Sequence, residues 1–294
     1  MFSTQLIGLR AETSVHAGTG ESSGNIDLPI MREQHSGWPV VFGSAVKGAL
    51  RSAAEQVLPD NPAHIQILFG PDTQNASDHA GALLVGDARL LALPVRSLTS
   101  QYRLVTCPDL VRRLSRDAQR FGIESLVLPE LDKPGNDEIL TATDEAHDYL
   151  FLEEYAYQRR TDTLTPLVEA MALLSDLSAE EISTKLAVVS NDSFAHICQS
   201  AIPVQAHIAI DNQTKTVQPG ALWHEESLPP DSLLYIGIHA GASRKRGEAM
   251  KASEVMSTLT EQVFGNHPYL QLGGNETTGM GWCKVNCVGP EACK

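Results

Sequence analysis

The chain has 294 residues, enough for one large domain or two small ones around a real hydrophobic core. Its formal net charge of −14 argues against a typical nucleic-acid-binding domain, which is basic, and its five scattered cysteines do not suit a disulfide framework. No apolar run approaches the roughly 20 residues of a membrane helix, and residues 1–11 lack a secretory signal, so we expect a cytoplasmic protein with no membrane partner.

The first half of the chain predicts strands, a long loop and two helices. Residues 2–15 alternate apolar and polar side chains as a strand does, and a polar, glycine-rich loop follows to about Pro39. Ser44 is the expected N-cap of a helix that ends at Val57, shortly before two prolines. The remaining predictions here are a short extended piece at 40–42, a strand at 82–93 with a bulge at 86–87, and a helix at 107–121.

Strands and helices are mixed in the second half as well. Residues 130–144 are rich in acidic, proline and glycine residues, which favours a surface insertion. A turn signal at 211–213 lies between two extended segments, 204–210 and 214–217, and predicts a hairpin. We further expect strands at 149–157, 233–240 and 282–285 and helices at 165–177, 192–199 and 248–264. Because the order lacks regular βαβ spacing, we predict an α+β fold with an antiparallel sheet.

Residues 16–51 hold the most informative pattern of the chain. A flexible, glycine-rich loop carries a lone carboxylate, Asp27, in the sequence Ile-Asp-Leu-Pro. The helix after it presents Lys47 and Arg51 four residues apart, on one face. A flexible backbone, a single carboxylate and a basic helix face together suit an extended phosphate chain better than a compact metabolite.

These motifs resemble the RAMP superfamily, the repeat-associated RNA-binding proteins of CRISPR systems, and within it the backbone subunits of type III-B (Cmr) effector complexes. The family patterns His-x-Gly-x-Gly, I-D-L-P-I-x-R-E, G-x-P and G-S-x-x-K-G-A-L-R occur in order between His16 and Arg51. A second match is the glycine-rich run at 273–281, whereas residues 95–160 match no family motif.

The resemblance implies a single RAMP domain over residues 1–294, with a ferredoxin-like, RRM-like core. That core would carry helical insertions, an insertion at about 95–160 and a thumb hairpin at about 204–232. The resemblance also implies the partners, which are a CRISPR guide RNA, a target RNA, other Cmr subunits and further copies of the chain. The copies would stack head to tail into a helical filament.

Asp27 stands at the position of the family's cleavage aspartate, so the resemblance implies a catalytic role and a divalent metal ion, Mg or Mn, bound there. His16 would orient the phosphate or the 2′-hydroxyl, and Glu225 belongs to an E-E-x-L-P element near the cut site. The residues alone leave plainer alternatives open. Asp27 could cap a turn before Pro29, His16 could satisfy loop carbonyls, and Glu225 with Glu226 could be an exposed acidic pair.

The same resemblance assigns guide-RNA binding to the helix at 44–57 and to the glycine-rich run. Lys47 and Arg51 would contact phosphates, and Ser44 lies at the helix N-terminus, which favours anions. The glycines expected to approach the RNA backbone closely are Gly273, Gly274, Gly279 and Gly281. A solvated helix face and a plain turn are the alternatives.

The resemblance implies an endoribonuclease that, within the assembled complex, cuts target RNA at regular intervals by metal-assisted transesterification, in antiviral defence. A non-catalytic RNA-binding scaffold would share every feature except the role of Asp27. A hydrolase that uses Ser22 is a third alternative, because residues 20–24 match G-x-S-x-G, although the helix that this elbow needs is not expected. Cys283, Cys287 and Cys293 have the wrong spacing for a common zinc site and are expected to be free thiols.

Overall fold

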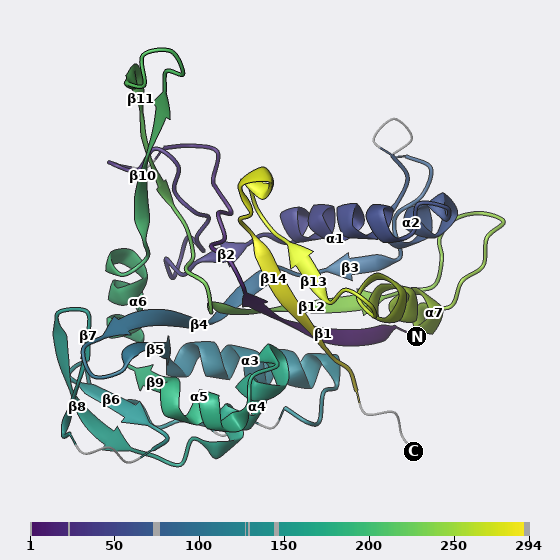
Figure 1. Ribbon diagram of the computed structural model, residues 1–294. Helices are drawn as coiled ribbons and strands as arrows, with labels where there is room; N and C mark the ends of the chain where they lie inside the picture. The colour runs from purple at the N-terminus through teal and green to yellow at the C-terminus, as the bar shows by residue number, and fades with distance from the viewer. Residues whose placement is uncertain are drawn as a thin grey trace.

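The computed structural model describes residues 2–22, 24–72, 77–126, 128, 130–143 and 147–290. It has a mixed α+β structure built on one large sheet, as predicted (Figure 1). Its strands are β1 Ser3–Ala11, β2 Val40–Val41, β3 Leu83–Val85, β4 Ala88–Ser97, β5 Gln101–Thr106, β6 Glu138–Thr141, β7 Tyr149–Leu152, β8 Tyr155–Thr161, β9 Leu186–Val189, β10 Val204–Ile210, β11 Val217–Glu226, β12 Leu233–Ala240, β13 Tyr269–Gln271 and β14 Trp282–Val288. Its helices are α1 Gly43–Val57, α2 Pro62–Phe69, α3 Pro108–Phe121, α4 Thr165–Ser175, α5 Ala179–Lys185, α6 Asn191–Ser200, α7 Ala252–Ser257, the π-helix η2 Thr258–Val263 and the 3-10 helix η3 Glu276–Thr278.

β1 lies between β12 and β14, and both of these pairings are antiparallel. Within the described residues the strand order is β13-β14-β1-β12-β4-β5-β9-β6-β8-β7, while β2 pairs with β4 and β3 with β12. Two pairs, β5–β9 and β6–β8, are parallel. The predicted antiparallel arrangement is confirmed around β1 and is wrong for these two pairs. The β5–β9 connection is long and includes helices α3, α4 and α5, which is the kind of crossover that a parallel pair needs.

The sheet separates two hydrophobic cores, and the alternation of side chains in β1 follows this division. Ile7 belongs to the same core as Leu50 of α1. Leu6 points the other way, into the core that α3 and α4 cover from the opposite side of the sheet (Figure 1). A β-carbon at Gly8 would lie 1.8 Å from the carbonyl oxygen of Leu174, so only glycine allows α4 to pack this closely against the strand.

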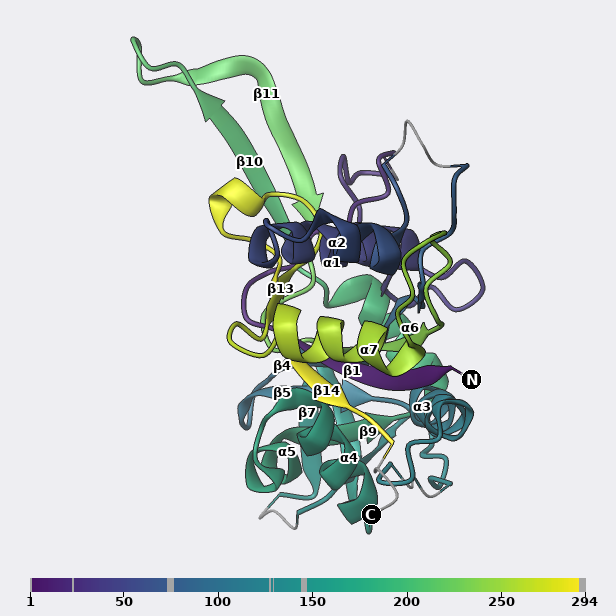
Figure 2. The same ribbon diagram turned by 90° about the vertical axis from the view of Figure 1, so that its right-hand side faces the viewer.

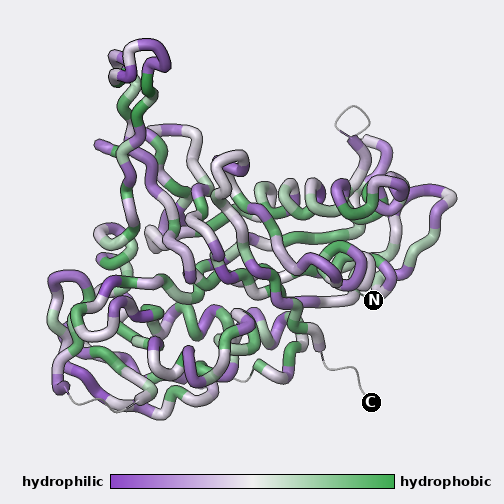
Figure 3. Tube along the Cα trace, in the orientation of Figure 1, coloured by the Kyte–Doolittle hydropathy of each residue, from purple (hydrophilic) through white to green (hydrophobic). Residues whose placement is uncertain are grey.

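β10 and β11 form a two-stranded hairpin, the thumb hairpin, which projects from the body of the molecule (Figures 1 and 2). The predicted turn is confirmed, because the carboxylate of Asp211 accepts hydrogen bonds from the backbone N–H groups of Gln213 and Thr214 at 2.8 and 2.9 Å. Ile208 and Leu222 lie opposite each other on the two strands and are 48% and 57% exposed. Hydrophobic segments therefore extend along the projecting hairpin (Figure 3), where they are available to another molecule.

Two predictions for the middle of the chain are wrong. Residues 130–144 are not only a surface insertion, because they supply β6, where Ile139 and Leu140 are fully buried between β8 and β9. Residues 149–157 form the hairpin β7–β8 rather than one strand, and Glu153 in its turn has a φ of +50°. The polar residues of these segments lie mainly in the turns at their ends. The strands between the turns are short, so their apolar residues form too weak a pattern to predict them.

The ends of two predicted helices also differ. The N-cap of α1 is Phe42 and not Ser44, which lies in the first turn. A carboxylate from outside the helix compensates, because Asp87 accepts a hydrogen bond from the backbone N–H of Gly43 at 2.7 Å. The helix predicted at 248–264 begins only at Ala252 and continues from Thr258 as a π-helix. Within the described part of the chain, no helix is long and apolar enough to cross a membrane.

Candidate functional site

The N-terminal loop, described over residues 16–22 and 24–39, is joined to the base of the thumb hairpin. Its two arms are connected by hydrogen bonds from Met31 N to Ala17 O at 2.8 Å and from Thr19 N to Pro29 O at 3.0 Å. The loop then runs beside β11, because the backbone of Leu28 donates to His224 O and accepts from Glu226 N, both at 3.0 Å. The position of this loop is therefore determined by the thumb hairpin.

Asp27 faces solvent at this junction, and its side chain is 55% exposed. One carboxylate oxygen accepts a hydrogen bond from the backbone N–H of His224 at 2.7 Å, and the same oxygen lies 3.5 Å from His224 Nδ1. The partner is thus distant in sequence and is not the local turn before Pro29. Among the described residues no hydrogen bond or ion pair reaches the second carboxylate oxygen, which can therefore meet a ligand.

His16 lies below the loop and is nearly buried. Its Nδ1 is 2.7 Å from the carbonyl oxygen of Glu226, which can only accept, so Nδ1 donates this hydrogen bond. In the neutral ring Nε2 is then an acceptor without a proton. A β-carbon at Gly18 would lie 2.6 Å from Nε2, so the glycine leaves this nitrogen uncovered.

Glu225 and Glu226 are both buried, so the alternative of an exposed acidic pair is wrong. Glu225 accepts a hydrogen bond from the side chain of Asn275, and its carboxylate lies 3.9 Å from His16 Nδ1. Glu226 forms an ion pair with Arg32 and accepts from the backbone N–H of Ile30. The first glutamate therefore connects the N-terminal loop to the glycine-rich run, and the second holds the loop in place.

The glycine-rich run, residues 273–281, packs directly on the backbone of His16. Gly274 N donates to His16 O at 2.8 Å, and a β-carbon at Gly273 would lie 2.2 Å from that oxygen. Gly281 is similarly crowded by the carbonyl oxygen of Leu272, whereas a β-carbon at Gly279 would meet nothing within 4 Å. Two of these glycines are thus required by close packing within the chain itself.

The two basic residues of α1 have different surroundings. Arg51 is engaged within the protein, because it forms ion pairs with Glu55 and Asp72 and donates to two backbone carbonyls. Lys47 has no ion pair among the described residues. Burial, together with the nearby positive charges of Arg244 and Arg51, lowers the pKa of Lys47. Lys47 is therefore the better placed of the two to meet a phosphate.

A groove lies between α1, the N-terminal loop and the glycine-rich run, and neither Lys47 nor Arg51 is among the residues that line it. It is floored by Gly48 and Ala49 on the exposed side of α1, and it is bordered by Gly18 of the N-terminal loop and by Gly273 and Gly274. Small residues along the floor let an extended chain lie close to the helix. Asp27 lies on the thumb side of the site, because its carboxylate is hydrogen-bonded to the backbone of β11.

No metal centre is evident in the described residues, which contain no group of three or more His, Cys, Asp or Glu side chains able to hold an ion.

The predicted free thiols are confirmed for Cys283 and Cys287, which form no disulfide. Burial raises the pKa of Cys283 to about 12 and that of Cys287 to about 11. Cys293 lies outside the described residues.

Sequence reasoning missed three residues of this site: Arg32, His224 and Asn275. Each contacts a predicted residue from a distant part of the chain, as Asn275 does with Glu225, 50 positions away. Arg32 lies in the I-D-L-P-I-x-R-E motif and Asn275 lies in the glycine-rich run at 273–281. Their positions in these two family motifs were the signal that could have identified them.

Comparison with known proteins is consistent with this geometry. Residues 9–284 match the family model of the RAMP superfamily. The CRISPR system Cmr endoribonuclease Cmr4 of Pyrococcus furiosus is 36% identical over 287 residues, covering 95% of this chain and 94% of that protein. The crystal structure of oligomeric Cmr4 from Pyrococcus furiosus is similar with a TM-score of 0.74 at 29% identity, covering 98% of both chains. A type III-B Cmr-beta complex bound to cognate target RNA contains a chain that shares the fold, with a TM-score of 0.75 at 21% identity and 97% coverage of both chains.

Proposed function

This chain belongs to the RAMP superfamily, and we propose on that premise that it is a guide-RNA-binding backbone subunit of a type III-B CRISPR effector complex that cleaves complementary target RNA. The observation that carries this proposal is the 36% identity to a Cmr endoribonuclease along nearly the whole chain. The partners would be a guide RNA, a target RNA, other Cmr subunits and further copies of the chain, since the similar crystal structure is of an oligomer.

The strand order supports a ferredoxin-like core within a single domain. Four strands follow the order β14-β1-β12-β4, with α1 on the connection from β1 to β3 and β4 and with α7 on the connection from β12 to β14. This is a βαββαβ arrangement of the split type. The strands and helices from β5 to β9 and the thumb hairpin are then additions to that core.

The proposed reaction is an attack by the ribose 2′-hydroxyl on the adjacent phosphorus. Asp27 accepts the proton of the 2′-hydroxyl while the new P–O bond forms and the bond to the 5′-oxygen breaks. The 5′-oxygen takes up a proton, and the products are a 2′,3′-cyclic phosphate and a 5′-hydroxyl. Asp27 is suited to this role because it is exposed yet held at one oxygen by a backbone N–H. His16, which is nearly buried, would position the neighbouring backbone.

A divalent ion at Asp27 has only partial support. The carboxylate and the His224 imidazole, 3.5 Å apart, are one ligand pair, and the described residues add no third ligand to them. An ion bound here would take its remaining ligands from the RNA, and it would supply charge stabilisation at the phosphate. The transfer of the proton from the 2′-hydroxyl to Asp27 does not depend on it.

The decisive experiment compares Asp27→Ala with the wild type in the complex assembled with guide RNA, target RNA and Mg²⁺. We expect cleavage to fall about 10²- to 10⁴-fold, the usual contribution of a positioned base, while guide binding is unchanged, because no hydrogen bond or ion pair among the described residues joins the Asp27 side chain to the groove. Glu21→Ala, which removes another exposed carboxylate from the same loop, is the matched control and should cleave normally. Normal cleavage by Asp27→Ala would instead identify the chain as a scaffold. The Ser22 hydrolase finds no support, because residues 24–29 form no helix.

A further inference from the structure

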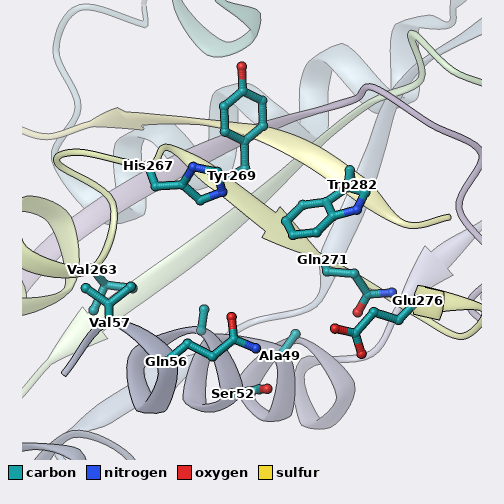
Figure 4. A pocket seen from close by; sticks show the side chains of 11 residues that line it. Ala49, Ser52, Gln56, Val57, Val263, His267, Tyr269, Gln271, Glu276 and Trp282 are labelled. Atoms are coloured by element: carbon teal, nitrogen blue, oxygen red, sulfur yellow. The ribbon is translucent and has the colours of Figure 1, made fainter. Parts of the chain in front are cut away.

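A hollow lined by aromatic side chains lies beside the groove, between α1 and the strands β13 and β14 (Figure 4). His267, Tyr269 and Trp282 form its wall on the strand side. Gln56 reaches into it from α1, and Glu276 reaches into it from the glycine-rich run, as Figure 4 shows. We call this place, lined by these five residues among others, the aromatic hollow.

The rings of the aromatic hollow leave faces open for stacking. The ring centroids of His267 and Trp282 are 6.2 Å apart with planes at 82°, and those of His267 and Tyr269 are 5.1 Å apart with planes at 47°. None of these pairs is stacked face to face. Tyr269 already has the ammonium of Lys284 over its ring at 5.0 Å, so Trp282 and His267 have the faces that a planar ligand could use.

Trp282 is unusual among the three tryptophans of the chain. Trp38 is buried, and the guanidinium of Arg113 lies 5.0 Å from its ring centroid. Trp223 is stacked on His207 in the thumb hairpin, with planes only 15° apart. Trp282 is half-buried and has no stacked partner among the described residues, so a planar ligand can stack on its ring.

The aromatic hollow is continuous with the groove. Ala49, Ser52 and Gln271 line both of them, so a chain lying over α1 passes the mouth of the hollow. A strand whose backbone lies in the groove can therefore turn a base sideways into the hollow.

The charge of the hollow favours a base rather than a phosphate. The carboxylate of Glu276 has no hydrogen bond or ion pair within the described residues, and neither has the amide of Gln56. A carboxylate repels phosphate but accepts hydrogen bonds from the exocyclic amino groups of adenine, cytosine and guanine. The amide can both donate to and accept from a base edge.

We propose that the aromatic hollow is a binding site for a single unstacked nucleobase of the RNA strand that lies in the groove, stacked on Trp282 and hydrogen-bonded to Glu276. The proposal rests on the proposed function, because it needs an RNA strand in the groove. Stacking makes the site tolerant of any base, and Glu276 adds a preference for bases that carry an amino group over uracil.

Photocrosslinking of the full chain assembled with guide RNA tests the location. Guide RNAs carry one 4-thiouridine each, moved along the sequence position by position, and crosslinked peptides are identified by mass spectrometry. We expect crosslinks to peptides containing Trp282, Tyr269 or His267 from one nucleotide in each repeating unit. Crosslinks confined to α1 and the glycine-rich run, with none to β13 or β14, would overturn the proposal.

Variants test the energetics. Trp282→Ala should weaken guide binding about 5- to 100-fold, the usual range for losing one base–aromatic stack, and Trp282→Phe should restore most of the affinity. Tyr149→Ala removes an exposed aromatic side chain from β7, far from the groove in sequence and fold, and is the control that should change nothing.

Because Trp282→Ala also changes a residue of β14, substitution of the exposed Glu276 provides a second test. Wild-type protein should bind cytidine oligonucleotides about 2- to 10-fold more tightly than uridine oligonucleotides, and Glu276→Ala should remove this difference.

The outcomes separate this proposal from the proposed function. If the wild-type chain binds no guide RNA under any condition, the proposed function itself fails. If it binds RNA normally while Trp282→Ala and Glu276→Ala leave binding and base preference unchanged, only the base site is refuted. If Trp282→Ala prevents copies of the chain from associating without RNA, the hollow accepts a protein segment and the proposal is wrong.

Discussion

Removal of the buried carboxylate of Glu226 should loosen the N-terminal loop from the thumb hairpin. The Glu226 side chain is 4% exposed, forms an ion pair with Arg32 and accepts a hydrogen bond from Ile30 N at 3.0 Å. Glu226→Ala leaves both groups without this partner. Arg32 is 24% exposed and keeps its hydrogen bonds to the carbonyl oxygens of Gly37 and Cys198 at 3.0 and 2.8 Å. Water and these two carbonyl groups therefore still stabilise part of its positive charge.

The magnitude follows from these contacts. Breaking one side of a buried ion pair costs about 3–5 kcal/mol, and the residual contacts of Arg32 place this case at the lower end, about 3 kcal/mol. For a chain of this size the loss corresponds to a fall in Tm of about 6–10 °C. Differential scanning calorimetry measures the fall, and hydrogen exchange should show the amide of Ile30 losing its protection.

The controls separate the ion pair from general effects of substitution. Glu226→Gln keeps an acceptor for Ile30 N and should lose only about 1–2 kcal/mol, and the exposed Glu21→Ala should stay within about 0.5 kcal/mol of the wild type. A Glu226→Ala protein that unfolds within 1 °C of the wild type, with Ile30 still protected, would refute the role assigned to this carboxylate.

Two further predictions concern the basic helix and the buried thiols. Lys47→Ala should leave Tm unchanged and should weaken guide binding, and the slope of log affinity against log salt concentration should fall by about 1. Arg51→Ala should instead lower Tm, because it removes the ion pairs to Glu55 and Asp72. Burial raises the pKa of Cys283 to about 12 and that of Cys287 to about 11, from 9.0 in the unfolded chain. Above pH 9 the thiols therefore ionise more readily in the unfolded chain than in the folded one, which favours unfolding. The free energy of unfolding should be at its full value below pH 9 and should decline as the pH rises from 9 toward 11–12. Urea unfolding at pH 8, 9 and 10 measures this decline, which Cys283→Ala should reduce.

The sequence predicts those parts of the fold that local patterns specify. The helix at 107–121 is confirmed as α3, because a proline in its first turn and a glycine after its end mark both boundaries. The turn of the thumb hairpin is confirmed for the same reason, since Asp211 forms it with neighbouring residues. The extended segment predicted at 214–217 is wrong, because β11 begins only at Val217 and continues to Glu226. β6 and β9 were not predicted, because each has four residues and becomes a strand only through partners far away in the chain.

For the candidate site too, the sequence predicts what local residues determine and not what contacts between distant residues determine. Residue type and resemblance predicted Asp27, and its exposure is consistent with that prediction. They could not predict that Glu225 and Glu226 are buried, because this depends on Asn275, 50 positions later, and on Arg32, 194 positions earlier. Basic residues were also overvalued, since a sequence does not show that the charge of Arg51 is already paired within the protein.

Asp27, the proposed base, is held by the thumb hairpin. Asp27 accepts from the backbone of His224 in β11, and Leu28 is hydrogen-bonded to the same strand on both sides. A molecule that docks on the exposed apolar surface of the hairpin therefore acts on the strand that holds the carboxylate. Each chain has one thumb hairpin and one Asp27, so in a filament of identical copies we expect the spacing of the cuts to equal the spacing of the copies. A shorter thumb hairpin with its base intact should therefore preserve the position of Asp27, because the hydrogen bonds that join Asp27 and Leu28 to β11 lie at that base.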